Sequence, residues 1–533
     1  MPRVPHVAFL CMEFGLHESF PIYSGGLGIL AGDFIKSARD LKRPVVAMGL
    51  RWDRGYCVQR IGEDGEPFEE FPGYDHSFLR DTRVRVRVRV RRKEVPCMVW
   101  VTDRFGHVPL YLLEPLRAED RWITHRLYES GSDVRIAQEM LLGIGGLRAL
   151  NWLATPISTY HFNEGHAVFA GVEMIAERME AGMSFEEAWA DVRRRIVFTT
   201  HTPVRAGNEE HSLKDLQRMG ATLELSAAEI RALGGDPFSM TAAGLRLARA
   251  ANAVSELHGR TARAMWAQVE GAAPIRSITN GVHAPTWQSE AIRKAGGDGN
   301  GLWAAHAVHR EELALEVERA TGVTLDPAGP WIGFARRAAP YKRGDLILRD
   351  PARLGKLLRE TRVQIVLSGK SHPDDLHGKA ILARLAHARS EYPGRIVFLE
   401  NYDMALGRLL TRGCDVWLNN PILPLEACGT SGMKAALNGV LNLSIPDGWW
   451  AEACEHGVNG WAIGDGRPTD DEHDLASLFA TLEEEVLPAW ADRARWKQMM
   501  RASVRTAEER FTSDRMVTEY FEKLYAEAPA EPA

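Results

Sequence analysis

The sequence predicts an α/β protein with two domains, each built around a mostly parallel sheet. Short apolar runs rich in β-branched residues alternate with longer amphipathic segments along most of the chain, a pattern typical of βα units. The length of 533 residues suits two large domains, or three to four smaller ones, at roughly 150 residues per domain. The expected strands cover residues 7–12, 44–50, 157–162, 196–200 and 275–279 in the first half, and 331–335, 364–368, 396–400, 415–419 and 440–444 in the second.

Glycine density marks the boundary between the domains. It is highest over residues 295–301, so the first domain should end there or at Pro285 just before it. A helix over about 302–321 then opens the second domain, and a last helix over 514–526 leads into a tail of Ala, Glu and Pro that cannot build a core. The predicted division is an N-terminal α/β domain over 1–290, a C-terminal α/β domain over 291–510, and a C-terminal helix and tail over 511–533.

Composition excludes several classes of function. The 65 Lys and Arg against 71 Asp and Glu give a net charge of −6, which is too balanced for wholesale binding of nucleic acid or an anionic membrane. No apolar run approaches the roughly 18 residues of a membrane span, and the N-terminal run meets Glu13 without a cleavage site. Six cysteines without a CxxC pair indicate a reducing compartment. We expect a cytoplasmic protein with a small or neutral substrate.

Residues 83–93 alternate strictly between arginine and valine before a final Arg-Arg-Lys. In an extended strand this places the valines on one face and the arginines on the other. The pattern favours a solvated strand face in an antiparallel pair with residues 99–101 or 111–113. A basic surface for an anionic partner is the alternative.

Two loops after predicted strands carry groups suited to anions. Residues 24–28, Ser-Gly-Gly-Leu-Gly, precede a helical pattern, so their amides could hold an anion at a helix N-terminus, or the glycines could form a plain turn. Residues 334–343 place four Arg and Lys side chains at the carboxyl end of a strand, where open α/β sheets bind ligands. A solvated loop is the alternative, but the tyrosine and proline among these cations favour placement for a ligand.

A third loop, residues 426–434, reads Glu-Ala-Cys-Gly-Thr-Ser-Gly-Met-Lys and precedes a helix expected to begin near Lys434. The loop amides and the Thr430 hydroxyl could bind a phosphate, with Lys434 on the first turn as a candidate amine. A plain capping loop would explain Thr430 and Ser431. It would not explain the lysine, Glu426 and two glycines together.

This loop, followed by Asn438-Gly439, strongly resembles the pyridoxal-phosphate lysine segment of the α-glucan (glycogen, starch, maltodextrin) phosphorylases. The resemblance covers about residues 7–460 and fits the short bacterial branch, which lacks the long N-terminal and interdomain extensions. It implies a GT-B type architecture, with two Rossmann-like domains facing a deep interdomain cleft. The other matching motifs, in family order, are Ser24-Gly-Gly-Leu-Gly28, Asn163-Glu-Gly-His166, Val254-Ser-Glu-Leu-His258, Thr279-Asn-Gly281 with Trp287, Arg336 to Arg343, Ser368-Gly-Lys370 and Phe398-Leu-Glu-Asn-Tyr402.

The resemblance implies a role for each matching residue. Lys434 would hold pyridoxal 5′-phosphate as a Schiff base, with Trp287 packed near the cofactor. The catalytic residues would be Lys434, Arg337, Lys342 and His258, with Arg337 and Lys342 on the substrate phosphate. No metal is expected. The residues around the cofactor phosphate would be Gly26, Arg336, Thr430 and Ser431. The substrate would contact Gly26 through its amides, His258, Asn280, Tyr341, Glu426 and Gly429, and His166 would lie toward the acceptor.

The implied reaction is reversible phosphorolysis of a glucan to α-glucose 1-phosphate with retention. Cations around two adjacent phosphates lower their repulsion while one passes a proton to the other. Three positions depart from better-known members. Cys428 replaces a usual serine, Ser431-Gly432 a glycine-asparagine pair, and Ala339-Pro340 a histidine-glutamate pair.

Two other functions are weighed against a phosphorylase. A nucleotide-sugar-dependent glucan synthase would share the architecture and an N-terminal Gly-Gly-Leu, but usually has a lysine two residues before the Gly-Gly, where this chain has Tyr23. A non-catalytic glucan-binding paralogue would share the fold. The joint presence of Lys434, Arg337, Lys342 and Glu426 argues against it. The expected partners are an α-glucan and phosphate or glucose 1-phosphate, without nucleic acid or membrane, and a second copy in a homodimer.

Overall fold

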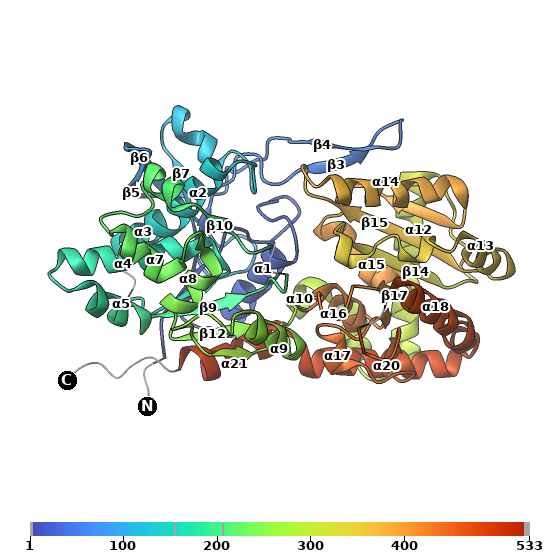
Figure 1. Cartoon of the computed structure of the whole chain (residues 1–533). Helices are drawn as coiled ribbons and strands as arrows, with labels where there is room; N and C mark the ends of the chain where they lie inside the picture. Colours follow the sequence, from blue (N-terminus) through green and yellow to red (C-terminus); the bar gives the residue numbers. More distant parts are fainter. Residues whose placement is uncertain (1–3, 154–155, 205–206, 469, 527–533) are drawn as a thin grey trace. The chain divides into compact units, whose positions relative to one another are not determined.

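Two separate sheets organise the chain (Figure 1). The computed structural model describes residues 4–153, 156–204, 207–468 and 470–526. Unit 1 comprises Met1–Tyr56, Phe71–Thr279 and Ser513–Ala533, and unit 2 comprises Cys57–Glu70 and Asn280–Thr512. The sequence predicted domain boundaries at 290/291 and 510/511. That division assigned residues 57–70 to the N-terminal domain, whereas in the structure they belong to unit 2. The tail expected after residue 526 lies outside the described residues.

Unit 1 is built on a nine-stranded sheet in the order β13-β12-β9-β8-β1-β2-β7-β6-β5. The strands from β13 to β7 run parallel, whereas β6 and β5 are antiparallel additions. The direction of chain growth reverses between β1 and β8, as in a Rossmann-like sheet. The strands are β1 (Val7–Leu10), β2 (Val45–Leu50), β5 (Arg80–Val90), β6 (Lys93–Thr102), β7 (Leu110–Pro115), β8 (Thr159–Asn163), β9 (Ile196–Thr200), β12 (Ala250–Ala253) and β13 (Ile275–Ser277), and β10 (Glu210–His211) pairs with β11 (Phe238–Ser239).

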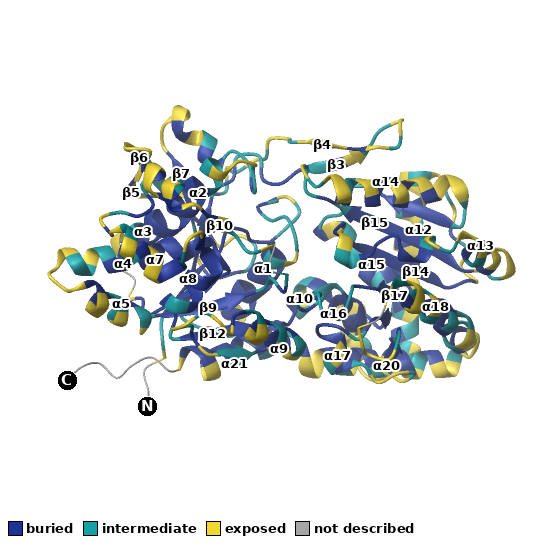
Figure 2. Ribbon diagram, viewed as in Figure 1, coloured by how far each residue is buried: buried dark blue, intermediate teal, exposed yellow. Residues whose placement is uncertain are grey.

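Helices of unit 1 connect these strands, and the central strands β12, β9, β8, β1, β2 and β7 are almost entirely buried (Figure 2). A π-helical segment, Tyr520–Tyr525, follows the last helix. The helices are α1 (Gly26–Asp40), α2 (Ser132–Met140), α3 (Gly146–Trp152), α4 (Val168–Glu180), α5 (Phe185–Arg193), α6 (Leu213–Met219), α7 (Ala227–Gly234), α8 (Met240–Leu247), α9 (Glu256–Met265) and α21 (Ser513–Glu519).

The arginine-valine segment forms β5, the outer strand of this sheet. Val86, Val88 and Val90 are buried, and the arginines between them are exposed. The pairing partner is β6, in antiparallel register with Val88 opposite Val95. The prediction of a solvated arginine face on an antiparallel pair is therefore confirmed.

Unit 2 is built on a six-stranded parallel sheet in the order β16-β15-β14-β17-β18-β19. In chain order this is 3-2-1-4-5-6, the strand order of the dinucleotide-binding Rossmann fold. The expected fold class, two Rossmann-like α/β units, is confirmed. The strands are β14 (Trp331–Arg337), β15 (Gln364–Lys370), β16 (Ile396–Leu399), β17 (Val416–Asn419), β18 (Leu441–Ser444) and β19 (Gly460–Ala462).

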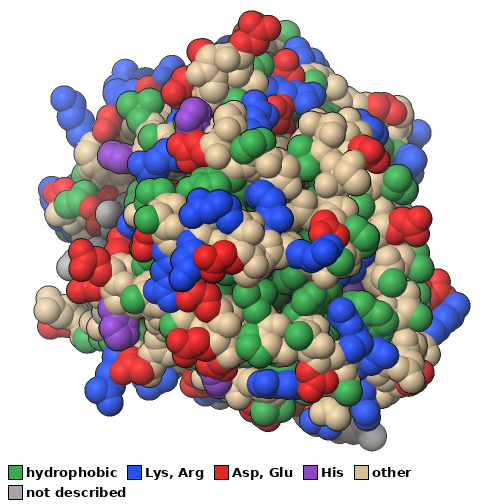
Figure 3. Space-filling view, turned by 90° about the vertical axis from the view of Figure 1, so that its right-hand side faces the viewer, with side chains coloured by type: hydrophobic (Ala, Val, Ile, Leu, Met, Phe, Trp, Pro, Cys, Tyr) green, Lys and Arg blue, Asp and Glu red, His purple; other side chains and the backbone are tan. Residues whose placement is uncertain are grey.

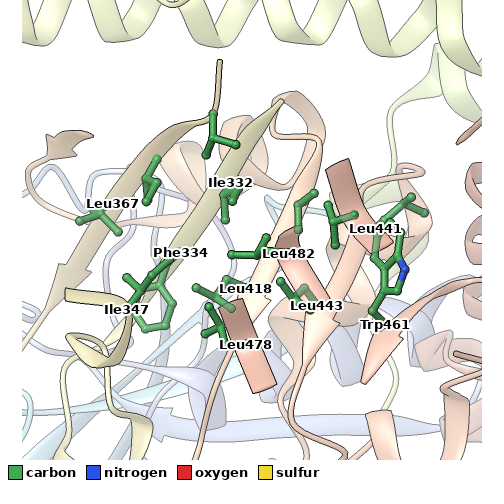
Figure 4. Packing of buried hydrophobic residues seen from close by; sticks show 14 of the residues in the cluster. Ile332, Phe334, Ile347, Leu367, Leu418, Leu441, Leu443, Trp461, Leu478 and Leu482 are labelled. Atoms are coloured by element: carbon green, nitrogen blue, oxygen red, sulfur yellow. The ribbon is translucent and has the colours of Figure 1, made fainter. Parts of the chain in front are cut away.

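Helices cover this sheet, and its core lies between the strands and the helical segments that follow them. Figure 4 shows Ile332, Phe334, Leu418 and Leu443 from the strands packed with Leu478 and Leu482. The helices are α10 (Ala284–Trp287), α11 (Glu290–Ala295), α12 (Gly299–Thr321), α13 (Pro351–Glu360), α14 (Leu376–Glu391), α15 (Met404–Gly413), α16 (Thr430–Leu437), α17 (Trp450–Ala453), α18 (Asp471–Thr481), α19 (Leu487–Ala491) and α20 (Arg493–Arg510).

A hairpin from the N-terminal part of the sequence belongs to unit 2. It consists of β3 (Val58–Ile61) and β4 (Pro67–Glu70) in antiparallel pairing. Lys379 Nζ lies 2.9 Å from Glu69 Oε2, and Gln59 Nε2 donates to Ser371 Oγ at 3.0 Å. These polar contacts attach the hairpin to α14 and to the end of β15.

Charged side chains of both signs are interspersed on the face that Figure 3 shows, without a large patch of one sign. Within the ranges that the structure describes, no helix is both long and apolar enough to cross a membrane.

Candidate active site

The sheet of unit 2 has a switch point between β14 and β17, and two of the predicted motifs meet there. Connections leave β14 and β17 in opposite directions, and open α/β sheets bind ligands at the carboxyl ends of strands on either side of such a point. β14 ends with Arg336 and Arg337. The chain after β17 passes through Glu426 and enters α16 at Thr430.

A buried ion cluster joins these two loops. Arg336 Nη2 donates a hydrogen bond to Glu426 Oε2, and Lys342 Nζ lies 3.0 Å from both oxygens of the same carboxylate. The side chains of Arg336, Lys342 and Glu426 are 7%, 12% and 11% exposed. Burial acts to raise the pKa of Glu426, but the two cations outweigh it and hold this pKa below its usual value. Glu426 is therefore ionised at neutral pH.

Arg336 has donors that this cluster does not use. Its Nε and Nη1 are buried and have no hydrogen-bond partner within the described part of the chain. Buried polar groups are nearly always paired, so two unused N–H groups beside a cation cluster indicate a place for a further oxyanion. The neighbouring Arg337 is exposed, and the structure does not bring its side chain into the cluster.

The loop between β14 and α13 is anchored by Arg343, the fourth cation of its motif. Arg343 is 1% exposed and lies in the left-handed region with φ 46. Its guanidinium donates to the carbonyls of Asn420 and Pro421 at 2.9 and 2.8 Å and to Asp474 Oδ2 at 2.7 Å. Arg343 thus ties this loop to the segment after β17. That contact helps hold Lys342 beside Glu426.

Asp447 accepts a hydrogen bond from the backbone of Glu426. The sequence analysis did not predict this role for Asp447. Its Oδ2 accepts the backbone N–H of Glu426 at 2.9 Å, and its Oδ1 accepts that of Gly448 at 2.7 Å. Burial raises the pKa of Asp447 to about 7; the Glu426 carboxylate adds to the rise and the two N–H donors oppose it. A single aspartate far along the chain gives no sequence signal for this contact.

Lys434 lies against an aromatic ring on the second turn of α16. Its Nζ is 3.6 Å from the centroid of the Trp287 ring, and both side chains are buried, an arrangement typical of a cation–π contact. The expectation that the helix begins near Lys434 is wrong. Gly429 adopts φ 84 at the N-cap, a conformation that glycine enters without strain, and α16 therefore starts at Thr430.

Asn438 holds the Trp287 and Lys434 segments together. Its Nδ2 donates to the carbonyls of Trp287 at 3.1 Å and of Lys434 at 2.8 Å. Its Oδ1 accepts the backbone N–H of Ser289 at 2.8 Å. The buried amide therefore sets the position of α10 relative to α16. The sequence motif contained Asn438 without indicating this role.

The first turn of α16 is packed tightly at Gly432 and carries hydroxyls beside it. A Cβ at Gly432 would lie 2.6 Å from Asn442 Oδ1 and 2.9 Å from Trp449 Nε1, so only glycine fits. Ser431 Oγ accepts from Trp417 Nε1 at 3.2 Å. Cys428 is buried, and its carbonyl accepts the N–H of Trp449 at 2.9 Å.

In unit 1, the glycine-rich loop leads directly into α1, as expected. Gly26 is the first residue of the helix and Gly25 its N-cap. A buried carboxylate that the sequence analysis did not assign holds this loop. Glu13 Oε2 accepts the N–H groups of Ser24 and Gly25 at 2.6 and 3.3 Å, and Glu13 Oε1 accepts from Tyr128 Oη at 2.8 Å. Burial raises the pKa of Glu13.

The two predicted histidines of unit 1 are buried at the carboxyl edge of its sheet, after β8 and β12. His258 is 1% exposed; its Nδ1 accepts the N–H of Val254 at 3.2 Å, and its Nε2 has no partner within the described residues. Burial lowers the pKa of His258 to about 4. Burial also holds the pKa of His166 well below its usual value. Both rings are therefore neutral at pH 7 and can accept or donate hydrogen bonds without charge.

The structure thus groups the predicted residues unevenly. Arg336, Lys342 and Glu426 form one cluster, and Lys434 and Trp287 form a second contact in unit 2. Tyr341 is partly buried beside Lys342, whose Nζ lies 4.9 Å from the tyrosine ring centroid. The remaining predicted residues are Gly429, Thr430 and Ser431 at the start of α16, Asn280, which is buried in unit 2, and Gly26, His166 and His258 in unit 1.

Comparison with known proteins decides the family. No family model matches the chain. A maltodextrin phosphorylase of Thermococcus litoralis is 40% identical over 98% of this chain and 71% of its own length. A glycogen phosphorylase of Mycobacterium bovis is 41% identical over the same shares of each chain. A glycogen phosphorylase of Aquifex aeolicus is 34% identical over 98% of this chain and 86% of its own length.

The chain belongs to the α-glucan phosphorylase family. Membership confirms the resemblance inferred from the lysine segment, the α-glucan phosphorylase function, and the glycosyltransferase class of the enzyme. The two Rossmann-like units agree with the GT-B type expected for a phosphorylase.

Proposed function

We propose that the chain catalyses reversible, retaining phosphorolysis of an α-1,4-glucan such as maltodextrin or glycogen, with pyridoxal 5′-phosphate bound to Lys434. The observation that carries the site assignment is the buried cluster of Arg336, Lys342 and Glu426 at the switch point of unit 2. A Cβ at Gly429 would lie 3.4 Å from Glu426 Cγ. The cluster therefore adjoins the start of the helix that carries Lys434.

The residues present fit the proposed cofactor. Lys434 offers an amine in a buried, aromatic setting. Thr430 and Ser431 offer hydroxyls on the first turn of α16, where backbone N–H groups and the helix dipole favour a phosphate. Arg336 offers two buried N–H groups without partners among the described residues. When bound, pyridoxal phosphate supplies a phosphate group that exchanges a proton with the substrate phosphate.

The cations of the site reduce the electrostatic repulsion between two phosphates that lie side by side. Phosphate groups at close range repel, and Arg336 and Lys342 lower that cost because they are already desolvated and in place. Glu426 engages both cations in this structure. An entering phosphate must therefore share them with the carboxylate. Arg337, exposed at the end of β14, is proposed as a further phosphate ligand.

The proposed reaction conserves atoms and charge without an oxidant or a metal. Substrate phosphate transfers a proton to the glycosidic oxygen, the bond between C1 and that oxygen breaks, and an oxocarbenium-like state develops. A phosphate oxygen then bonds to C1 on the same face. The products are α-glucose 1-phosphate and a glucan shortened by one unit.

The other assigned residues would bind the sugar. His258, Asn280, Tyr341, Glu426 and Gly429 are proposed to hold the glucosyl unit. The low pKa of His258 supports a neutral hydrogen-bonding role for that ring. His166 is proposed to lie toward the acceptor, and the amides at Gly26 to assist with the phosphate. A homodimer and a cytoplasmic location complete the proposal; the second rests on the cysteine pattern.

A spectrum tests the cofactor assignment. Purified protein should carry about one pyridoxal phosphate per chain, visible by absorbance and reduced irreversibly by borohydride onto Lys434, as peptide mapping would show. Lys434→Ala should remove both the absorbance and the activity. Lys356→Ala, at an exposed helical lysine, should leave both unchanged. Colourless protein that still turns over substrate would refute the assignment.

Donor specificity tests the reaction. The protein should release glucose 1-phosphate from maltodextrin and phosphate, extend maltodextrin from glucose 1-phosphate, and ignore UDP-glucose and ADP-glucose. Transfer from a nucleotide sugar at a comparable rate would favour a synthase. Glucan binding without turnover of any donor would favour a non-catalytic paralogue.

A further inference from the structure

The loop that carries Glu426 has no regular secondary structure to hold it. Glu426 lies in an irregular stretch between β17 and α16. Its side chain is held by Arg336 and Lys342. Its backbone N–H donates to Asp447 Oδ2 at 2.9 Å. Two separate sets of contacts therefore fix Glu426, one through its carboxylate and one through its main chain.

Asp447 lies on a turn that is itself closely packed. The turn follows β18, and the Asp447 carbonyl accepts the N–H of Trp450 at 3.1 Å, where α17 begins. Gly448 has φ 53, and a Cβ at this position would clash with the carbonyl oxygen of Cys428. The same carbonyl accepts the N–H of Trp449 at 2.9 Å. The turn after β18 thus packs directly against the loop after β17, and Asp447 is buried between them.

The hydrogen bonds of Asp447 match an ionised carboxylate. Its Oδ2 accepts from Glu426, and its Oδ1 accepts the N–H of Gly448 at 2.7 Å. An ionised carboxylate accepts at both oxygens, whereas an asparagine or a protonated aspartate presents a donor in place of one of them. The ionised form of Asp447 is therefore the one that satisfies both N–H groups.

The surroundings of Asp447 bring its titration close to neutral pH. The charged groups that face it are Glu426, from the loop after β17, and Lys342, from the loop after β14. Burial raises the pKa of Asp447 to about 7, with the Glu426 carboxylate adding to the rise. The two N–H donors and Lys342 oppose it. Both protonation states of Asp447 are thus reached at pH values near neutrality.

The cations lose part of their hold on Glu426 in the proposed reaction. An entering phosphate shares Arg336 and Lys342 with the Glu426 carboxylate, so each hydrogen bond that a cation transfers to phosphate is one that Glu426 no longer receives. Asp447 contacts the backbone of Glu426 instead and does not compete with phosphate for the cations. Its contact therefore remains available when the glucosyl unit has to be held.

We propose that Asp447 is a positioning residue for phosphorolysis: its ionised carboxylate holds the backbone of Glu426 and so keeps the Glu426 carboxylate toward the glucosyl unit while phosphate occupies the cations. The inference rests on the proposed role of Glu426 in binding the sugar. Asp447 acts through Glu426 and is assigned no contact with the substrate.

Asp447→Asn tests this role because it keeps the shape of the side chain and removes its charge. In phosphorolysis at saturating phosphate and pH 8, kcat/KM for maltoheptaose should fall about tenfold, since a small misplacement of a substrate-binding group slows the reaction. The KM for phosphate should not rise. Parental maltoheptaose kinetics in this variant would overturn the proposal.

Asp350→Asn is the matched control. Asp350 also accepts a backbone N–H, that of Arg353 at 2.9 Å, as the N-cap of α13. Asparagine caps helices about as well as aspartate, so this variant should keep parental kinetics at every pH.

The pH dependence separates positioning by charge from general damage to the loop. A protonated Asp447 resembles asparagine. The ratio of parental to Asp447→Asn kcat/KM should therefore fall from about tenfold at pH 8 toward one at pH 5.5. Titration of the substrate phosphate affects both enzymes alike and cancels in this ratio. A ratio that does not change with pH would indicate a structural role alone and would overturn the proposal.

A double-mutant cycle separates this inference from the proposed role of Glu426. If Asp447 acts through Glu426, Asp447→Asn should lower kcat/KM by less than about twofold further in the Glu426→Gln background. Additive effects would overturn the inference and leave the sugar-binding role of Glu426 intact. Parental maltoheptaose kinetics in Glu426→Gln would instead refute the sugar-binding role, and the inference with it.

A second substitution covers the case in which Asp447→Asn fails to fold. Asp447→Ser keeps a hydroxyl that can accept one N–H. It should lower kcat/KM for maltoheptaose at pH 8, by a factor that becomes smaller in acid. Parental kinetics in this variant at pH 8 would overturn the proposal.

Discussion

Replacing Glu426 with glutamine removes the anion from the buried cluster while keeping the shape of the side chain. Arg336 and Lys342 would then share a desolvated site without a counterion. Removing one partner of a buried ion pair costs about 3–5 kcal/mol. We expect Glu426→Gln to lower the free energy of unfolding of unit 2 by at least about 3 kcal/mol at pH 7. With a urea slope of about 3 kcal/mol per M for a unit of this size, the midpoint falls by about 1 M.

The loss of unfolding free energy in Glu426→Gln should be large at neutral pH and disappear in acid. The folded-state pKa of Glu426 is below its unfolded value because Arg336 and Lys342 outweigh the effect of burial. The stabilisation is therefore complete above the unfolded pKa, about 4.3, and is lost as the pH falls through the folded pKa. Parent and variant should differ at pH 7 and converge in strongly acidic solution.

Inorganic phosphate should restore part of the loss, because it gives the two cations a new anion. A ligand at 100 times its dissociation constant contributes about 2.7 kcal/mol, so phosphate should raise the urea midpoint of the variant more than that of the parent. Unfolding is followed by tryptophan fluorescence and circular dichroism. Glu290→Gln, which breaks an exposed helical pair with Lys294, is the control and should leave the midpoint unchanged. A parental midpoint in Glu426→Gln at pH 7, or a loss of equal size in acid, would refute this view of the cluster.

Three further variants or measurements extend these expectations. Arg337→Ala should raise the KM for phosphate and lower kcat/KM on the order of 10²-fold, since a phosphate ligand acts in both ground and transition states; steady-state phosphate kinetics measures this. Gly432→Ala should lower the thermal midpoint by several degrees, because the added Cβ would lie 2.6 Å from Asn442 Oδ1 and overpacking costs about 1–3 kcal/mol. The His258 ring, with a pKa of about 4 against about 6.5 unfolded, should show no titration by NMR between pH 5 and 8, and its contribution to stability should decline as the pH falls from 6.5 through 4.

The strand positions followed from apolar, β-branched runs, and this is why the ten expected strands are present. β12 was not predicted because Ala250–Ala253 consists of three alanines and an asparagine, which lack the β-branched side chains typical of strands. Its place between β9 and β13 comes from tertiary pairing rather than from local preference. The sequence also gave no indication that the hairpin of β3 and β4 belongs to unit 2. Its contacts, such as Glu69 with Lys379, join residues about 310 positions apart.

The candidate site could be located from motifs but not resolved in detail. The motifs contained Arg336, Lys342, Glu426 and Lys434, since these residue types in these loops suit phosphate and an amine. The motifs did not indicate that Glu426 would be the shared counterion of both cations. Isolated residues such as Glu13 have no neighbours in sequence that reveal their partners. Their roles depend on hydrogen bonds between distant loops.

The arginine face of β5 bears on how copies of this chain can associate. An outer strand with unpaired backbone groups is a template for another strand, and β5 is eleven residues long. If two copies extended the sheet through β5, arginines of both chains would face one another at about 5 Å, a repulsive arrangement for like charges. Addition of copies strand by strand, the first step toward a fibre, is thereby opposed, and a dimer is left to other surfaces of the molecule.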